Sequence, residues 1–448
     1  MTLTQPIAQS TLDAYFDGIG RLLGRKERRA NFALYAMGLL SKLERKTVEA
    51  IAAMTSGVDR HVNEKAYDHL LNFTHASPWL DEAVRSYAAE YALKELRKKG
   101  ELDTWIIDDT GFLKQGTHSV GVKRQYTGTA GKITNCQVAV SLTVSTREQH
   151  LPLDMELYLP EEWIEDKPRR AEAKIPDDVV FRTKPEIALD MIARWVLDDV
   201  PLASLSADSG YGYDGKFRGG VTQMGFKYTL GVHSNLLVRR LYPDGTVGPD
   251  QSVEELAKSL PGKKYRKVAW LEGTKKTLSS RFASVRVQVV NPDSAEPLEQ
   301  GLLIEWPKKD KGPQHYTLVT LPEGTPLKEV VRRTKARWHV EGGYEDMKGE
   351  LGLDHFEGRS WIGWNHHVSV VLATYALVIA CKLRAFPPSA SGSVQSREDG
   401  RADHAPLCRF LRHGSSRPAA ACGEVAARVF PGAPVAGDAA RGTEGAAA

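Results

Sequence analysis

The order of extended and helical segments between residues 104 and 232 constrains the fold of this chain most. Three β-type segments come first, followed by a helix, a strand, a helix and a last strand. These segments cover residues 104–110, 136–144, 150–159, 185–200, 203–207, 217–224 and 226–232. Strands that alternate with helices after an initial run of strands predict a mixed α/β layer. The fold class expected is therefore α/β, with helices flanking a mixed sheet.

Other segments surround this layer and predict the division into domains. Residues 1–100 have helical periodicity throughout and indicate an N-terminal helical domain. Residues 233–325 contain short β-type segments separated by Gly, Pro and Lys, which indicates a β-rich insertion between two parts of the α/β core, 101–232 and 326–386. Residues 387–448 contain no Lys, Ile, Asn, Met, Tyr or Trp, and we expect this tail to be disordered because it offers little apolar surface to bury.

Composition and charge say more about the cellular location of the protein than about its function. Lys and Arg number 60 against 56 Asp and Glu, so the net charge of +4 neither requires nor excludes a polyanionic partner. The 4 cysteines form no CxxC pair, which favours a reducing, cytoplasmic location. The longest apolar run, residues 368–381, is shorter than the roughly 20 residues that span a bilayer, so we expect a buried helix and no membrane role.

Three acidic residues stand out by their context. Asp109 and Asp208 end hydrophobic strands, and Glu341 lies in a basic helical segment. Carboxylates at such positions are costly to bury unless a cation meets them, and Mg²⁺ prefers oxygen ligands. The sequence has no HExxH motif, no Cys/His cluster and no GxxxxGK[ST] loop, so zinc chemistry and P-loop nucleotide hydrolysis find no support.

Basic residues accompany Glu341. Arg337 lies four residues before it and Lys348 seven after it, which places all three on one face of a helix. Such a face either binds phosphates or is a solvated surface with an i,i+4 ion pair. Further basic residues before Arg337 favour phosphate binding; they are Lys328, Arg332, Arg333 and Lys335. A second basic cluster, residues 25–29, is either a phosphate-contacting part of a helical DNA-binding domain or a solvated helix face.

The segment around Glu341 resembles the insertion-sequence transposases of the DDE class, in the subgroup with a Tyr-(2)-Arg-(3)-Glu-(6)-Lys motif. Arg337, Glu341 and Lys348 match this spacing, whereas Thr334 stands where the tyrosine would be. Residues 107–112 and 206–212 resemble the segments around the first and second acids, and residues 351–361 are typical of one branch of these transposases. The resemblance implies an RNase H-like catalytic domain interrupted by a β-rich insertion.

The resemblance also implies roles for individual residues. Asp109, Asp208 and Glu341 would bind two Mg²⁺ ions, with Mn²⁺ as a substitute, and Arg337, Lys348, Arg333 and Lys335 would contact DNA phosphates. Asp108 is the rival for the first acid. Asp109 is preferred because the family's first acid usually precedes a hydroxyl residue, here Thr110. Only one of the two neighbours can face the metals, since adjacent strand residues point to opposite faces.

The expected function is that of a transposase that binds terminal inverted repeats, cleaves there, and joins the ends to target DNA as a homodimer on paired ends. Two other hypotheses stay open: a catalytically inactive DNA-binding remnant or repressor, and a metal-dependent nuclease without strand transfer. Two local features also stay open. The loop between Gly116 and Lys132 either touches the DNA end or merely connects strands, and Gly342-Gly343 indicates either a loosened helix or a closely approaching DNA backbone.

Overall fold

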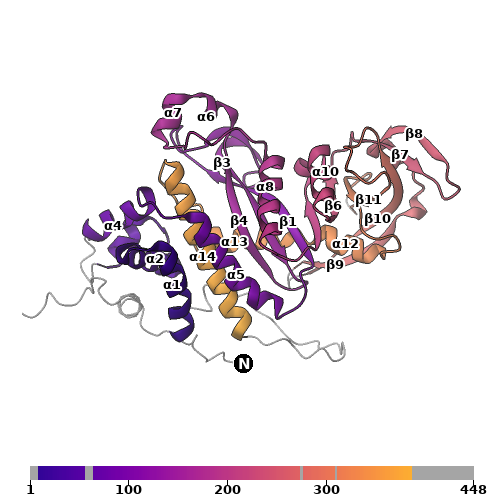
Figure 1. Ribbon diagram of the computed structural model, residues 1–448. Helices are drawn as coiled ribbons and strands as arrows, with labels where there is room; N and C mark the ends of the chain where they lie inside the picture. The colour runs from indigo at the N-terminus through magenta and orange to yellow at the C-terminus, as the bar shows by residue number, and fades with distance from the viewer. Residues whose placement is uncertain (1–8, 56–63, 273–275, 308–309, 386–448) are drawn as a thin grey trace, which may run out of the picture.

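A computed structural model describes residues 9–55, 64–272, 276–307 and 310–385. The segment 387–448, for which disorder is expected, lies outside these residues. Figure 1 shows a central sheet with the N-terminal helices and the long helix α14 (Trp361–Ala385) on one side and the β-rich insertion at the other end. The predicted α/β class is confirmed.

Five strands form the core of the sheet, in the order β4-β3-β1-β5-β6. β1 runs antiparallel to β3, β3 runs antiparallel to β4, and β1, β5 and β6 are mutually parallel. This is the RNase H-like arrangement that the sequence predicts. The bounds are β1 Thr104–Leu113, β3 Lys132–Ser145, β4 His150–Tyr158, β5 Ser204–Ala207 and β6 Lys227–Val232.

Helices make the connections that parallel strands require. The chain passes from β4 to β5 through α6 (Glu161–Glu165), α7 (Lys167–Glu172) and α8 (Lys184–Leu197). Thr183 and Glu186 form a capping box that fixes the start of α8. From β5 to β6 it passes through α9 (Ser209–Gly212) and α10 (Gly215–Gln223).

The β-rich insertion continues the core sheet. Its strand β12 (His315–Val319) pairs antiparallel with β6, so that 12 strands of the described chain form one sheet. The buried ion pair between Arg218 of α10 and Glu296, at 2.7 Å, also ties the insertion to the core. Its other elements are β7 Leu237–Leu241, β8 Val247–Ser252, α11 Val253–Ser259, β9 Arg266–Glu272, β10 Lys276–Val289 and β11 Gln300–Trp306.

The N-terminal helices share one hydrophobic core with the central sheet and α14. They are α1 Gln9–Leu23, α2 Lys26–Leu40, α3 Val48–Ala53, α4 Glu64–His75 and α5 Asp81–Arg97. α5 packs along α14, and both helices contact β4. α14 is long and apolar enough to cross a membrane, but 83% of its apolar window is buried within the protein. Packing in this core therefore accounts for its apolar sequence.

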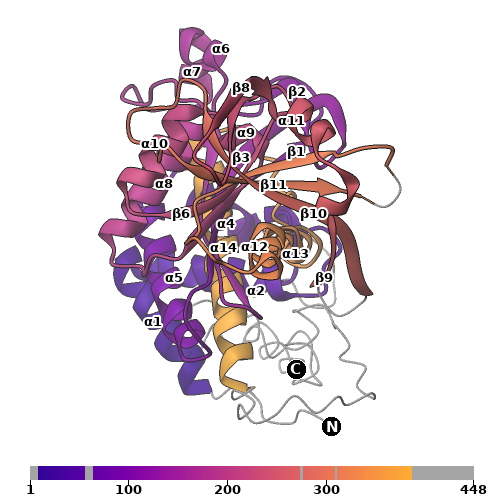
Figure 2. The same ribbon diagram turned by 90° about the vertical axis from the view of Figure 1, so that its right-hand side faces the viewer.

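Two helices precede α14 in place of one continuous basic helix around Glu341. α12 (Leu327–Lys335) and α13 (Trp338–Gly349) are separated at Ala336 and Arg337, where His339 and Val340 donate main-chain hydrogen bonds three residues back. α12 and α13 lie on one side of the sheet, and α8 and α10 lie on the other (Figure 2). Arg337 therefore occupies a bend at the start of α13.

Candidate active site

The two neighbouring acids of β1, Asp108 and Asp109, point to opposite faces of the sheet. Asp108 is buried and faces α13, where its Oδ2 accepts a hydrogen bond from Arg337 Nη2 at 3.1 Å. Asp109 points away from α13 and forms an ion pair with Lys184 at the start of α8. The alternation of side chains along a strand produces this division. The structure thus brings Asp108, the rival of the preferred Asp109, to the face where Arg337 lies.

The second strand-end acid, Asp208, lies beside Asp108. β5 pairs in parallel with β1 up to Ile107 and Ala207, so the residues that follow these two meet at the same end of the sheet. Asp208 Oδ1 accepts a hydrogen bond from the main-chain N–H of Gly210 at 2.8 Å, and its Oδ2 is 3.9 Å from Arg337 Nη2. The parallel pairing of two strands therefore places both carboxylates next to one guanidinium.

The electrostatics of this cluster show a shortage of positive charge. Burial raises the pKa of Asp108 to about 6; Arg337 opposes this shift, and the charge of Asp208 adds to it. Burial opposes ionisation of Arg337, but Asp108, Asp208 and Glu341 together raise the pKa of its guanidinium. Asp108, Asp208 and Glu341 therefore share the single positive charge of Arg337. One positive charge does not neutralise three carboxylates.

Glu341 and Lys348 lie at the two ends of α13. Glu341, in the first turn, is exposed and has no hydrogen bond or ion pair with any described residue. Lys348, in the last turn, donates to Thr110 Oγ1 and to the carbonyl oxygen of Gly111, both at 2.8 Å. Burial lowers the pKa of Lys348. α13 thus runs along β1, with Arg337 and Lys348 reaching the strand at separate points.

Arg333 and Lys335 are not brought to this site. Arg333 pairs with Glu329 at 2.8 Å and lies 3.7 Å from Asp103, which precedes β1 at the opposite end of the strand. Lys335 pairs with Glu305 of the insertion at 2.8 Å. Their charges are taken up within the protein, so the structure gives no support to the expected phosphate contacts of these two residues.

The donor set fits a divalent cation in part. Asp108 and Asp208 offer carboxylate oxygens, the ligands that Mg²⁺ prefers. The guanidinium of Arg337, a cation, lies 3.1 Å from the first and 3.9 Å from the second. The hydroxyl of Tyr211 is buried beside these acids without a hydrogen-bond partner. Across the ranges that the structure describes, however, no three Asp, Glu, His or Cys side chains are grouped closely enough to hold a metal. Glu341 therefore stands apart from the two aspartates.

Sequence reasoning missed two tyrosines near the acids. Tyr211 lies in the short helix after Asp208, and Tyr344 lies one turn after Glu341 on α13. The hydroxyl of Tyr344 is 2.5 Å from Ser141 Oγ, and burial together with the charge of Asp108 raises its pKa. The spacing of three residues from Glu341 was the available signal for Tyr344.

The two glycines of α13 differ in their surroundings. A Cβ atom on Gly343 would lie 3.3 Å from His150 Nε2 of β4, whereas one on Gly342 would meet nothing within 4 Å. Close packing of α13 against β4 therefore accounts for Gly343. The two explanations that the sequence left open are not needed for that position.

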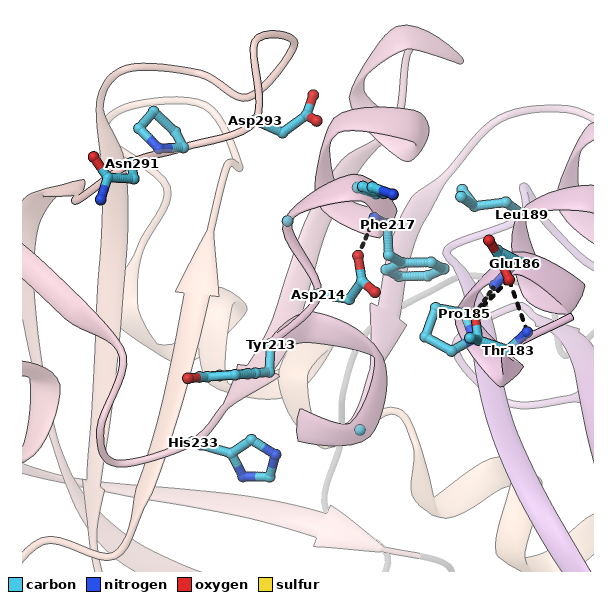
Figure 3. A pocket seen from close by; sticks show the side chains of 14 residues that line it. Thr183, Pro185, Glu186, Leu189, Tyr213, Asp214, Phe217, His233, Asn291 and Asp293 are labelled. Atoms are coloured by element: carbon cyan, nitrogen blue, oxygen red, sulfur yellow. Dashed lines mark hydrogen bonds between the residues drawn. The ribbon is translucent and has the colours of Figure 1, made fainter. Parts of the chain in front are cut away.

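A cavity of about 670 Å³ lies between α8, α10 and the insertion, next to the helix that follows Asp208. Figure 3 shows Tyr213 and His233 on one side of it and Glu186 with Phe217 on the other. The rings of Tyr213 and His233 meet edge to face, with centroids 4.9 Å apart. Its lining carries three acids, Glu186, Asp214 and Asp293, against one lysine, Lys216, so it is a poor site for a phosphate.

Comparisons with known proteins show which proteins the chain is similar to. A protein-family model described as "DDE superfamily endonuclease" matches residues 16–277. The chain is also 29% identical over 327 residues to the "Probable transposase for insertion sequence element IS701" of Microchaete diplosiphon, a match that covers 72% of this chain and 76% of that protein.

Proposed function

Because the chain belongs to the DDE superfamily of endonucleases, we propose that it is a transposase that binds terminal inverted repeats, cleaves DNA there and joins the ends to target DNA. The similarity to a probable insertion-sequence transposase supports this proposal. The observation that carries it is the meeting of Asp108 and Asp208, from neighbouring parallel strands, at Arg337 of α13.

We assign the first acid to Asp108 in place of Asp109. Asp108 shares a face with Arg337 and with Thr110, which Lys348 contacts, whereas Asp109 is paired with Lys184 on the other face. Asp208 is the second acid and Glu341 the third. The ligand set proposed for the metal ions is therefore Asp108, Asp208 and Glu341.

Two Mg²⁺ ions, or Mn²⁺ as a substitute, would be held by these carboxylates and would supply polarisation of the phosphodiester and activation of the attacking hydroxyl. Arg337 would bind a phosphate oxygen beside the scissile bond through its planar guanidinium. Lys348, at the other end of α13, would bind a neighbouring phosphate as a point charge. The buried hydroxyls of Tyr211 and Tyr344 lie near these acids.

The partners proposed are double-stranded element ends and target DNA, bound by a homodimer in the cytoplasm. The N-terminal helices, residues 1–100, would bind the repeats. The exposed Arg25 and Lys26 at the start of α2 provide positive charge for this contact.

Cleavage of a duplex that carries the inverted repeats flanking the gene tests the function. We expect Mg²⁺-dependent cutting by the natural protein and a loss of at least about 10³-fold in Asp208→Ala and Asp108→Asn. Asp109→Asn is the matched control and keeps cutting. Cutting by Asp208→Ala would refute the assignment. Cutting without end joining identifies a nuclease, and repeat binding without cutting identifies an inactive DNA-binding remnant.

A further inference from the structure

The hairpin formed by β2 (Lys123–Thr127) and β3 reaches the rim of the candidate active site. Thr129, in its turn, accepts a hydrogen bond from the N–H of Gly111 at 3.2 Å, and Lys348 Nζ is 3.3 Å from the same hydroxyl. The sequence left this segment open as either a DNA contact or a plain connection. The turn of the hairpin is held by hydrogen bonds to Gly111 and Lys348.

Gly111 permits this close approach. A Cβ atom at this position would lie 1.9 Å from Thr127 Oγ1, so any side chain there would displace the hairpin. The turn therefore crosses β1 at a residue without a side chain. Its position beside Lys348 follows from that crossing.

The strands of the hairpin expose apolar side chains directly before and after the turn. Tyr126 is 63% exposed and Ile133 is 59% exposed, and the two are opposite each other in the strand register. Water solvates the apolar surface of an exposed aromatic side chain and its β-branched neighbour poorly. Such a pair can stack on a base or separate two bases.

Exposed positive charge lies near this pair: Arg124 shares its face of the hairpin, and Lys132 lies next to Ile133 on the opposite face. Arg124 and Lys132 are exposed, and neither has an ion-pair partner among the described residues, whereas Lys123 is paired with Glu162 at 2.8 Å. Free cations next to an exposed aromatic are the combination that single-stranded nucleic acid binds. The charges favour a polyanion over an apolar protein surface as the occupant.

We propose that the β2–β3 hairpin binds the unpaired end of a DNA strand, with Tyr126 stacking on a base and Arg124 and Lys132 contacting phosphates. Ile133 supports the stacked base from the opposite strand. This inference rests on the proposed function, because it assigns the hairpin to the same DNA end. It adds a site for unpaired bases on the hairpin whose turn contacts Lys348.

Binding of DNA without metal tests the proposal separately from catalysis. The probes are a fluorescein-labelled single strand of random sequence, about 20 nucleotides long to exceed the length that one such binding site covers, and the blunt duplex of the same sequence, both in EDTA. We expect Tyr126→Ala to weaken single-strand binding about 10-fold, in line with a stacking contribution of about 1–3 kcal/mol per base, and to leave duplex binding unchanged. Tyr126→Phe keeps the ring and binds as the natural protein does.

Tyr242→Ala is the matched control, because Tyr242 is also exposed and lies in the insertion. An unchanged melting temperature verifies that Tyr126→Ala is folded. Equal single-strand binding by Tyr126→Ala and the natural protein would overturn the proposal, and so would an equal loss for strand and duplex. If Asp208→Ala abolishes cutting while Tyr126→Ala changes nothing, the hairpin proposal fails and the proposed function stands.

Discussion

Two acid–arginine clusters lie along β1. The amino-end cluster consists of Asp103, Glu329, Arg332 and Arg333, and the mid-strand cluster, just past the point where β5 stops pairing, consists of Asp108, Asp208 and Arg337. In the first, Arg332 donates to both oxygens of Asp103, at 2.7 and 2.8 Å. In the second, Arg337 donates to one oxygen of Asp108 at 3.1 Å and stays 3.9 Å from Asp208.

The pKa values reflect the difference in charge balance. Hydrogen bonds from Arg332 and Arg333 lower the pKa of Glu329 to about 2, and those from Arg332 outweigh burial to lower the pKa of Asp103. In the mid-strand cluster, burial raises the pKa of Asp108 to about 6. Two acids with two arginines form a structural ion-pair network, whereas acids that outnumber their cation leave room for another.

The largest effect on stability is expected from removing the central arginine of each cluster. Arg332→Ala should lower the free energy of unfolding by about 3 kcal/mol, because it leaves Asp103 without its bidentate partner. Arg337→Ala should lower it by about 2 kcal/mol in EDTA. Mg²⁺ should restore the melting temperature of Arg337→Ala but not that of Arg332→Ala.

Thermal unfolding with and without MgCl₂ measures this contrast. The natural protein gives the reference shift for Mg²⁺. Restoration of both variants, or of neither, would show that the two clusters do not differ in their need for a cation.

A smaller and opposite pair of effects is expected from neutralising one acid in each cluster. Asp103→Asn should lower the free energy of unfolding by about 2 kcal/mol, since it breaks a largely buried pair. Asp108→Asn should leave it unchanged or raise it by about 1 kcal/mol, because it removes a buried charge that is poorly compensated. Urea unfolding at about pH 7.5, above the pKa of Asp108, measures both without metal. A similar loss in both variants would contradict the comparison.

The effect that is smallest at neutral pH concerns His339, which lies near Asp103 and Arg332. Burial lowers the pKa of its imidazole from 6.5 to about 4. Below pH 6.5 the unfolded chain therefore binds a proton that the folded protein does not, and stability falls by up to about 1.4 kcal/mol per pH unit down to about pH 4. His339→Phe should reduce the fall in the free energy of unfolding with decreasing pH by the contribution of one proton. Urea unfolding between about pH 7 and pH 5 measures this slope. An unchanged slope would show that His339 does not contribute.

Much of the fold could be predicted from the sequence because strand and helix periodicities are local. The order of the five core strands and of α8 and α10 between them is confirmed, and so are the positions of Asp208 at the end of β5 and of Glu341 on a helix. The choice between Asp108 and Asp109 could not be made in this way. Alternation separates two neighbours but does not say which face carries α13.

The roles of the individual basic residues could not be predicted from the sequence either. Arg333 and Lys335 belong to the same basic stretch as Arg337, yet their partners Asp103 and Glu305 are distant in sequence. The strand β2 was missed because its exposed residues carry no clear alternation of burial. Each of these points depends on contacts between residues that are distant in the sequence. A local sequence pattern does not reveal such contacts.

The brevity of β5 has a consequence for how a polymer reaches the acids. β5 pairs with β1 only as far as Ile107, and beyond that point Gly111 offers its main-chain groups to Thr129 and Lys348 instead of a strand. A longer β5 would cover this edge of β1 with a ladder of hydrogen bonds. The approach of a polymer to the acids along this edge thus depends on where one short strand ends.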